Sequence, residues 1–267
     1  MRTVGFVGAG RMGSAMVRRL VAAGHDVNAL ARSPEKSAAI TELGATPAAD
    51  LAAVCAGADM VVICVFTDEQ VRDVSDALAA DLRPGTVLII HTTGSPHTAE
   101  AIAARGVDVI DAAVSGGPHD IAAGRLTLFV GGSDAAVERA RPVLSCYGNP
   151  IVHAGPPGAG QRVKLINNAV FAAQVGLITA AVELGERLGV PESTLLAALP
   201  HASAGSRALD SVSRAGSVGS FRTVLGEFVS KDVATVRTTA AELGTDLGVL
   251  DTIIDTGMAP TGGSNSA

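Results

Sequence analysis

A glycine-rich segment close to the start of the chain is the feature that most constrains the fold. It follows an apolar run that predicts a strand over Thr3–Val7, and it opens a predicted helix over Arg11–Ala23. In this context a GxGxxG pattern indicates a dinucleotide-binding turn, because the glycines allow a tight turn, close approach of the pyrophosphate and close helix packing. The amino end of the helix then favours the anion. The candidate cofactor residues here are Gly8, Ala9, Gly10, Arg11, Met12 and Gly13.

Short apolar runs alternate with stretches of helical length through the first part of the chain, as far as about residue 155. Further strands are predicted over Asp26–Leu30, Asp59–Cys64, Val87–Ile90, Val107–Ile110 and Leu126–Val130, with a second helix over Pro34–Leu43. Such alternation predicts an α/β domain of Rossmann type, in which helices cover both faces of a doubly wound parallel sheet.

The pattern changes after the breaker-rich segment from Gly155 to Gly160. Helices are predicted over Gln161–Leu188, Glu192–Leu199 and Ser230–Leu243, and no further strand is expected. We therefore predict a cofactor-binding domain over residues 1–158, an all-helical domain for substrate and oligomer contacts over 159–258, and a disordered polar tail over 259–267.

Charge and cysteine content narrow the classes of partner. The chain has 20 basic and 26 acidic residues and no basic run, which argues against nucleic acids and anionic membranes. Leu165–Val182 is uncharged and almost long enough to span a membrane, but polar residues interrupt it, so a buried helix is the preferred interpretation. Three scattered cysteines favour a reducing compartment, the cytoplasm. The six histidines lack metal-ligand spacing, so no metal is expected.

The end of the second predicted strand bears on cofactor choice. An acidic residue at this point would bind the ribose hydroxyls of NAD, but the sequence has Arg32 and Ser33 there. A guanidinium and a hydroxyl suit a phosphate, which favours NADP, with NAD still possible. The alternative is that Arg32 is a solvated surface residue.

Polar residues near the domain junction are candidates for catalysis. Lys164 and Asn168 are four residues apart on the long predicted helix, and a partly desolvated lysine can exchange protons near neutral pH. An ordinary surface lysine is an equally good interpretation. Ser115, Gly116 and Gly117 follow a strand and offer backbone N–H groups to a substrate carboxylate. Lys231 and Asp232 form a weaker candidate, since most such pairs lie on helix surfaces.

The ordered set of motifs resembles the β-hydroxyacid dehydrogenase family, from about residue 3 to about residue 250. Besides the glycine turn, four segments carry the resemblance: Asp111 to Gly117, Gly155 to Gly160 with Lys164, Asn167 and Asn168, His91 to Pro96, and Lys231 to Val233. The short-chain dehydrogenases are excluded, because the single tyrosine, Tyr147, has Ile151 where their mechanism needs a lysine.

The resemblance implies roles for individual residues. Lys164 would be the general acid and base for a small β-hydroxy acid and its semialdehyde or keto form. Substrate would be bound by Ser115, Gly116, Gly117, Asn168 and Lys231. The cofactor would meet Thr93, Lys231 and the segment Val65, Phe66 and Thr67. The family also implies a homodimer or homotetramer.

Two departures from the family pattern keep alternatives open. Few residues follow Lys231, so the family's last helix is expected to be missing or replaced by the tail. His91-Thr92-Thr93-Gly94 is also unusual for the segment beside the nicotinamide. The alternatives are a reductase of the same architecture that acts on an imine or a bulkier carbonyl, and a cofactor-binding protein without turnover.

Overall fold

The computed structural model describes residues 1–258, apart from the side chains of residues 225–228 and 258. The predicted tail over 259–267 lies outside the described residues. The chain forms two compact units, Met1–Lys164 and Leu165–Ala267, and each is described by itself.

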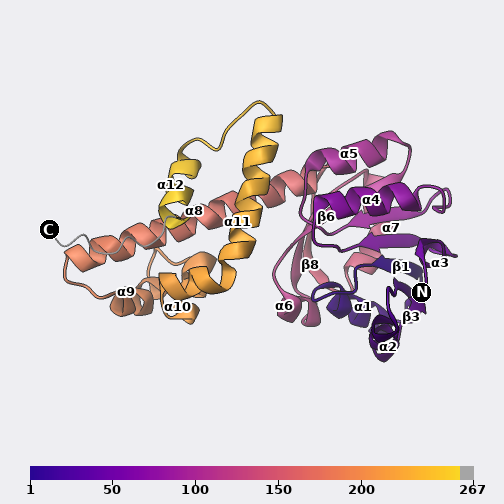
Figure 1. Ribbon diagram of the computed structural model, residues 1–267, viewed down its shortest axis with the longest axis horizontal. Coiled ribbons are helices and arrows are strands. Elements are labelled where there is room, and N and C mark those ends of the chain that lie inside the picture. Colours follow the sequence, from indigo (N-terminus) through magenta and orange to yellow (C-terminus); the bar gives the residue numbers. More distant parts are fainter. Residues whose placement is uncertain (259–267) are drawn as a thin grey trace. The chain divides into compact units, whose positions relative to one another are not determined.

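The first unit is an eight-stranded sheet with helices on both faces (Figure 1), as the fold class predicted. The strand order is β3-β2-β1-β4-β5-β6-β7-β8. The strands are β1 (Thr3–Val7), β2 (Asp26–Leu30), β3 (Thr46–Ala48), β4 (Met60–Ile63), β5 (Val87–Ile90), β6 (Asp108–Ser115), β7 (Leu126–Gly131) and β8 (Gly148–Gly155). The helices are α1 (Gly13–Ala22), α2 (Pro34–Glu42), α3 (Leu51–Cys55), α4 (Asp68–Leu78), α5 (Pro96–Ala104), α6 (Pro118–Ala122) and α7 (Asp134–Leu144).

Alternate residues of the central strands enter two separate cores. Phe6 and Val62 pack with α1, α2, α6 and α7, whereas Val61 and Ile63 pack with α3, α4 and α5. Because both faces are covered, the strands consist almost entirely of apolar residues. The layering brings the carboxyl ends of β1, β4, β5 and β6 to one edge of the sheet, where α/β proteins bind ligands.

The sheet is mixed, which corrects the prediction of a parallel sheet. β7 pairs antiparallel with β6, and β8 then runs parallel to β7. The connection from β6 to β7 contains only the five-residue helix α6, and a parallel return needs about a dozen residues or more. β3 and β8 were also missed, because Pro47, Pro150 and two glycines interrupt their apolar pattern.

The second unit consists of helices packed around the long helix α8 (Ala159–Arg187), whose first turns belong to the first unit. The others are α9 (Glu192–Ala198), a 3₁₀ turn over Leu199–His201, α10 (Arg207–Ala215), α11 (Val218–Glu242) and α12 (Val249–Met258). By length and composition α8 could cross a membrane, but only half of its most apolar window is exposed.

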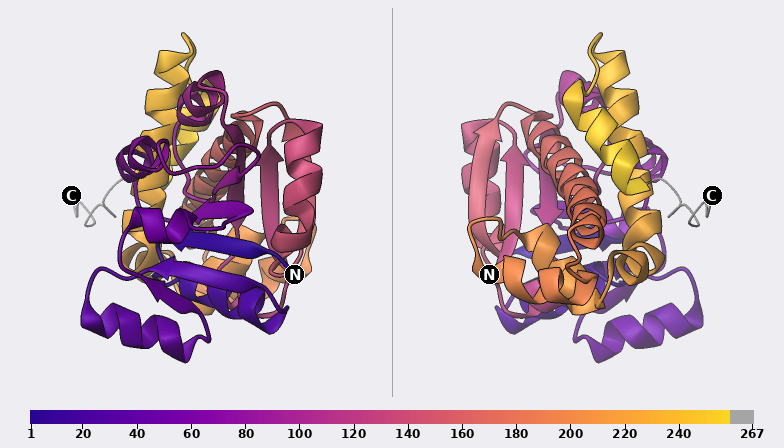
Figure 2. Two further views of the ribbon diagram at one scale, coloured as in Figure 1. Left: turned by 90° about the vertical axis from the view of Figure 1, so that its right-hand side faces the viewer. Right: turned by 90° about the vertical axis from the view of Figure 1, so that its left-hand side faces the viewer.

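The segment after Lys231 contains a further helix, α12, which the sequence analysis did not predict. α12 packs on α8 so closely that a Cβ added to Gly176 would overlap the carbonyl oxygen of Ile253. Arg237 of α11 pairs with Asp251 at 2.7 Å and Asp255 at 2.5 Å, and Ile254 is fully buried. Figure 2 (right) shows α12, drawn in yellow, alongside α11. Close backbone approach and two ion pairs therefore hold α12 in place.

Candidate active site

The glycine turn between β1 and α1 has the conformation that its sequence predicted. Gly8 has a φ of +101°, and an added Cβ would overlap the carbonyl oxygen of Cys64. An added Cβ on Gly13 would overlap the carbonyl oxygen of Gly8 and approach the Phe6 ring. Gly10 differs, because nothing lies within 4 Å of its Cβ position. Of the three glycines in the turn, Gly10 is thus the one with open space beside it, where a ligand can approach the backbone.

The amino end of α1 is suited to an anion. Within the described chain no side chain caps this helix, and no acidic residue lies in its first turn. The partial positive charge of the helix end is therefore not neutralised. The partial positive charge of this helix end and the open space at Gly10 together fit a dinucleotide pyrophosphate.

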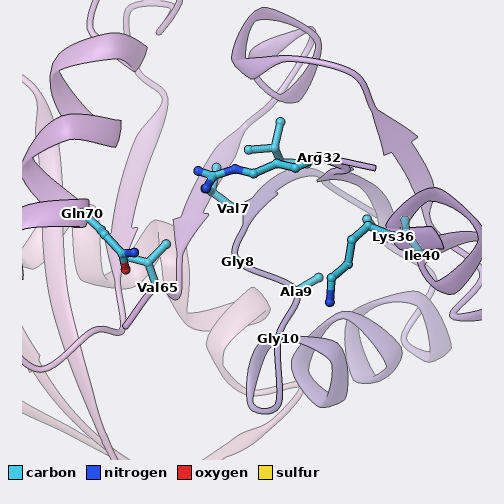
Figure 3. A pocket seen from close by; sticks show the side chains of 10 residues that line it. Val7, Gly8, Ala9, Gly10, Arg32, Lys36, Ile40, Val65 and Gln70 are labelled. Carbon is cyan, nitrogen blue, oxygen red and sulfur yellow. The ribbon is translucent and has the colours of Figure 1, made fainter. Parts of the chain in front are cut away.

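A pocket of about 240 Å³ lies over the glycine turn (Figure 3). The Arg32 side chain extends toward Val7, Lys36 lies on one side of the pocket, and Val65 and Gln70 lie on the side opposite Lys36. The complete lining is Val7, Gly8, Ala9, Gly10, Leu30, Arg32, Lys36, Ile40, Val65 and Gln70. The pocket therefore presents two cations, and among its lining residues no carboxylate.

The sequence analysis missed Lys36, because no local pattern marks this residue before the fold brings α2 to the pocket. Ser33 caps α2 by accepting a hydrogen bond from the Lys36 backbone N–H at 3.3 Å. A hydrogen bond from Ser33 also lowers the pKa of the exposed Glu35 carboxyl group. The Ser33 hydroxyl therefore already caps the amino end of α2. Its contact with a cofactor phosphate stays a prediction.

The loop after β4 carries three of the predicted cofactor residues. The backbone N–H groups of Phe66 and Thr67 donate to Gln70 Oε1, at 2.9 and 3.2 Å, and Thr67 caps α4. Thr92, in the loop after β5, donates its hydroxyl to the Val65 carbonyl and accepts from the Val65 N–H. Thr93 follows, and it is half-buried. The two loops are thus joined, and they place Val65 at the pocket.

His91, the unusual residue of the β5 loop, is completely buried. Its Nδ1 lies 2.6 Å from the Ala112 carbonyl oxygen, and its Nε2 lies 2.9 Å from the Tyr147 hydroxyl. Burial lowers the pKa of His91 to about 4, and it raises the pKa of Tyr147. A neutral histidine directly after β5 therefore links this loop to β6 and to the residue before β8.

The first turn of α8 is held by Asp111, at the edge where β6 meets β5. Its buried carboxylate accepts from the Gly158 N–H at 2.6 Å and the Gln161 N–H at 2.7 Å. Burial raises the pKa of Asp111, and these hydrogen bonds from the helix end oppose the rise. Lys164 is half-buried and lies one turn beyond Gln161. Lys164, the candidate acid and base, therefore belongs to a helix whose first turn is held by Asp111.

The loop after β6 corrects one detail of the sequence analysis. The Gly117 N–H, which was offered to a substrate carboxylate, donates instead to Asp120 Oδ2 at 2.8 Å. Gly116 has a φ of +129°, and Ser115 ends β6 half-buried. Ser115 and Gly116 stay candidates, but the Gly117 backbone already has a partner.

The remaining candidates lie in the second unit. Asn168 of α8 is buried and donates to Asp232 Oδ2 of α11 at 2.9 Å, while Asn167 donates to Asn168 Oδ1 at 3.2 Å. The fold therefore brings together two motifs that are 64 residues apart. Lys231 precedes Asp232 on α11, and it is half-buried.

Comparison with known proteins gives two family models that cover nearly all of the chain. Residues 3–155 match the NAD binding domain of 6-phosphogluconate dehydrogenase. Residues 158–256 match a domain described as the NAD-binding domain of NADP-dependent 3-hydroxyisobutyrate dehydrogenase.

Individual relatives agree with these models. The chain is 34% identical to an NAD-dependent L-serine dehydrogenase of Pseudomonas aeruginosa over 217 residues, 79% of this chain and 73% of the relative. It is 36% identical to a probable 3-hydroxyisobutyrate dehydrogenase of Mycobacterium tuberculosis over 199 residues, 73% of this chain and 68% of the relative.

A solved structure extends the likeness to the whole fold. The structure of Mycobacterium tuberculosis 3-hydroxyisobutyrate dehydrogenase with L-serine superimposes with a TM-score of 0.74 at 28% identity. The match covers 97% of this chain and 100% of that one. The chain thus belongs to the β-hydroxyacid dehydrogenase family and is an NAD(P)-dependent oxidoreductase acting on CH–OH groups.

Proposed function

We propose that this protein interconverts a small β-hydroxy acid and its semialdehyde or keto acid, with NADP as the preferred cofactor and Lys164 as general acid and base. The observation that carries the proposal is the joining of three elements at one sheet edge. Hydrogen bonds link the pocket residue Val65, the loop containing Thr93 and the first turn of the helix that bears Lys164. The candidate groups for cofactor binding and proton transfer would thereby be held on one scaffold.

The glycine turn would bind the pyrophosphate through the α1 end, beside the open space at Gly10. When bound, the nicotinamide cofactor donates or accepts a hydride. Val65 and Thr93, from neighbouring loops, would orient its nicotinamide half. Lys231, in the second unit, stays a candidate for contact with the cofactor and the substrate.

Lys164 would move the proton that accompanies hydride transfer. In reduction its ammonium group donates a proton to the carbonyl oxygen of the substrate. In oxidation the neutral amine accepts the proton of the substrate hydroxyl group. Ser115, Gly116, Asn168 and Lys231 would bind the substrate and its carboxylate, with Asn168 oriented by its hydrogen bond to Asp232.

The preference for NADP is supported by the two cations at the pocket, since a 2′-phosphate there would meet Arg32 and Lys36. The relative from Pseudomonas aeruginosa is named as NAD-dependent, so the preference needs its own test. NADPH and NADH would be titrated in parallel by their fluorescence. We expect tighter NADPH binding, and a loss of that difference in Arg32→Ala and Lys36→Ala. Equal binding by the unmodified protein would overturn the preference.

Substrate class is tested by following cofactor absorbance with L-serine, 3-hydroxyisobutyrate and related β-hydroxy acids, the substrates named for relatives. A cyclic imine with NADPH serves as the comparator. Turnover of the hydroxy acids alone would support the proposal. Turnover of the imine alone would point to a reductase of the same architecture, and binding without turnover would point to a cofactor-binding protein.

We also propose that the protein acts as a homodimer or homotetramer in the cytoplasm. The support is a row of exposed apolar residues along α8 and the residue that follows it, comprising Ile166, Val170, Leu177, Leu184 and Leu188. A row of this kind suits burial against a second copy. Light scattering should give a mass of at least two chains, and Leu177→Glu should lower it. A monomer at high concentration would contradict the assembly. The free thiols of Cys55, Cys64 and Cys146 support a reducing compartment, which cell fractionation would test.

A further inference from the structure

Gln161 is a buried polar residue that the proposed function does not place in contact with substrate or cofactor. It lies in the first turn of α8, and its side chain is only 2% exposed. Its amide Nε2 donates to the Thr92 carbonyl oxygen at 2.7 Å, and its Oε1 accepts from the Gly94 N–H at 3.0 Å. A buried side chain therefore satisfies two backbone groups of another loop.

The two backbone groups lie on either side of Thr93. Thr92 contributes the carbonyl of the peptide before it, and Gly94 contributes the N–H of the peptide after it. Both peptide planes that set the position of Thr93 are thus fixed by one amide. A glutamine is suited to this role because it offers a donor and an acceptor side by side.

The same residue extends a continuous chain of hydrogen bonds. The backbone N–H of Gln161 donates to Asp111, its side chain bonds the loop after β5, and Thr92 in that loop bonds Val65 at the pocket. Gln161 therefore connects the helix turn that leads to Lys164 with the loop that carries Thr93.

We propose that Gln161 is a positioning residue for hydride transfer. It sets the separation between Thr93, which the proposed function places at the nicotinamide, and the helix turn that bears Lys164. The inference rests on that proposed function. Because reaction rates are sensitive to displacements of about 1 Å, loosening this link should slow hydride transfer roughly 10- to 100-fold. Of the pocket lining, Val65 alone joins this link, through Thr92, whereas the glycine turn, Arg32 and Lys36 lie outside it. NADPH affinity should therefore change little.

Two variants distinguish an effect on the position of Thr93 from an effect on the stability of the fold. Gln161→Leu removes both hydrogen bonds. Gln161→Glu keeps the size of the side chain and the acceptor for the Gly94 N–H. An ionised carboxylate has no donor for the Thr92 carbonyl, however, and its oxygen repels that carbonyl oxygen. Protonation of that carboxyl group restores a donor, so activity should recover as the pH is lowered.

Thr86→Val is the matched control. Thr86 is buried and donates to the Ala58 carbonyl at 3.1 Å, close to the start of β5 at the opposite edge of the sheet. Its loss removes one buried hydrogen bond of the same unit without touching the site.

The measurements are melting temperature, NADPH affinity, and single-turnover reduction with NADPH carrying hydrogen or deuterium at the transferred position. We expect slower hydride transfer and a larger isotope effect in both Gln161 variants at pH 8. The ratio of Gln161→Glu to unmodified activity should rise toward pH 6. The proposal is overturned if both variants match Thr86→Val in rate and isotope effect, or if that ratio does not change with pH. Absence of turnover in the unmodified protein would instead overturn the proposed function.

Discussion

The two units position their polar residues by different physical means. In the first unit, buried side chains at the edge of a sheet hold the loops by hydrogen bonds, as Thr92, Asp111 and Gln161 do. In the second, helices approach closely at Gly176 and are joined by partly exposed ion pairs of Arg237. The first arrangement depends on backbone conformation and protonation, and the second on helix contact. Perturbations should therefore have different consequences in the two units.

The largest effect is expected at Gly8 in the first unit. Gly8→Ala places a Cβ at a φ of +101° and against the Cys64 carbonyl, so the free energy of unfolding should fall by roughly 3–5 kcal/mol. Gly10→Ala is the matched control, because its Cβ enters open space. That control should keep its stability and lose dinucleotide affinity. Urea unfolding and cofactor titration of both variants check the prediction, and equal stability of the two would contradict it.

The buried histidine should make the stability of the first unit depend on pH. His91 is neutral when folded, with a pKa of about 4 compared with 6.5 when unfolded, so the unfolded state binds a proton first as the pH falls. Stability that is present above pH 6.5 is lost progressively down to pH 4, by about 3 kcal/mol. The raised pKa of Asp111 acts in the opposite direction.

A variant isolates the histidine in that experiment. Unfolding free energies of the unmodified protein and of His91→Gln are compared between pH 7 and pH 4. The variant should be less stable at pH 7 but should lose less on acidification. Parallel curves would show that His91 is not the group responsible.

Helix contact in the second unit is tested at Gly176. Gly176→Ala forces α8 and α12 apart at Ile253 and Gly257, and should cost about 2 kcal/mol. Gly219→Ala in α11 is the control, since its nearest neighbour lies at 3.9 Å. Thermal unfolding should separate the two variants. A stable Gly176→Ala protein would mean that the close approach contributes little.

The smallest effect is expected for the ion pairs of Arg237. Arg237→Ala should cost about 0.5–1 kcal/mol, because the side chain is 40% exposed, and the loss should shrink in high salt. Arg141→Ala removes a single exposed pair with Glu138 on α7, and its effect should be smaller still. Denaturant unfolding at low and high salt compares them. Equal losses of unfolding free energy in the two variants would show that the ion pairs between α11 and α12 add no stability beyond that of a pair within one helix.

The sequence predicted the parts of the fold that depend on local pattern. The glycine turn, the fold class and several strand ranges, β1 and β2 among them, are confirmed because apolar periodicity and glycine spacing are local signals. β7 was predicted as a strand, but its antiparallel direction was missed, because strand direction depends on the length of a connection rather than on composition. α12 was missed because its stability comes from contacts with α8 and α11.

The candidate site divides in the same way. Motif residues such as Lys164 could be named from spacing, whereas Gln161 and Lys36 acquire roles only when the strands bring distant segments together. The engagement of Gly117 by Asp120 was likewise a matter of loop conformation. One sequence reveals which residues can carry chemistry, but the fold determines which of them already have partners.

The measurement that tests the account most directly is turnover by Lys164→Ala together with its NADPH affinity. Loss of the general acid and base should lower turnover by about 10²- to 10⁴-fold, while NADPH binding stays close to that of the unmodified protein. Turnover that survives the substitution would contradict the assignment of Lys164 and, with it, the proposed chemistry.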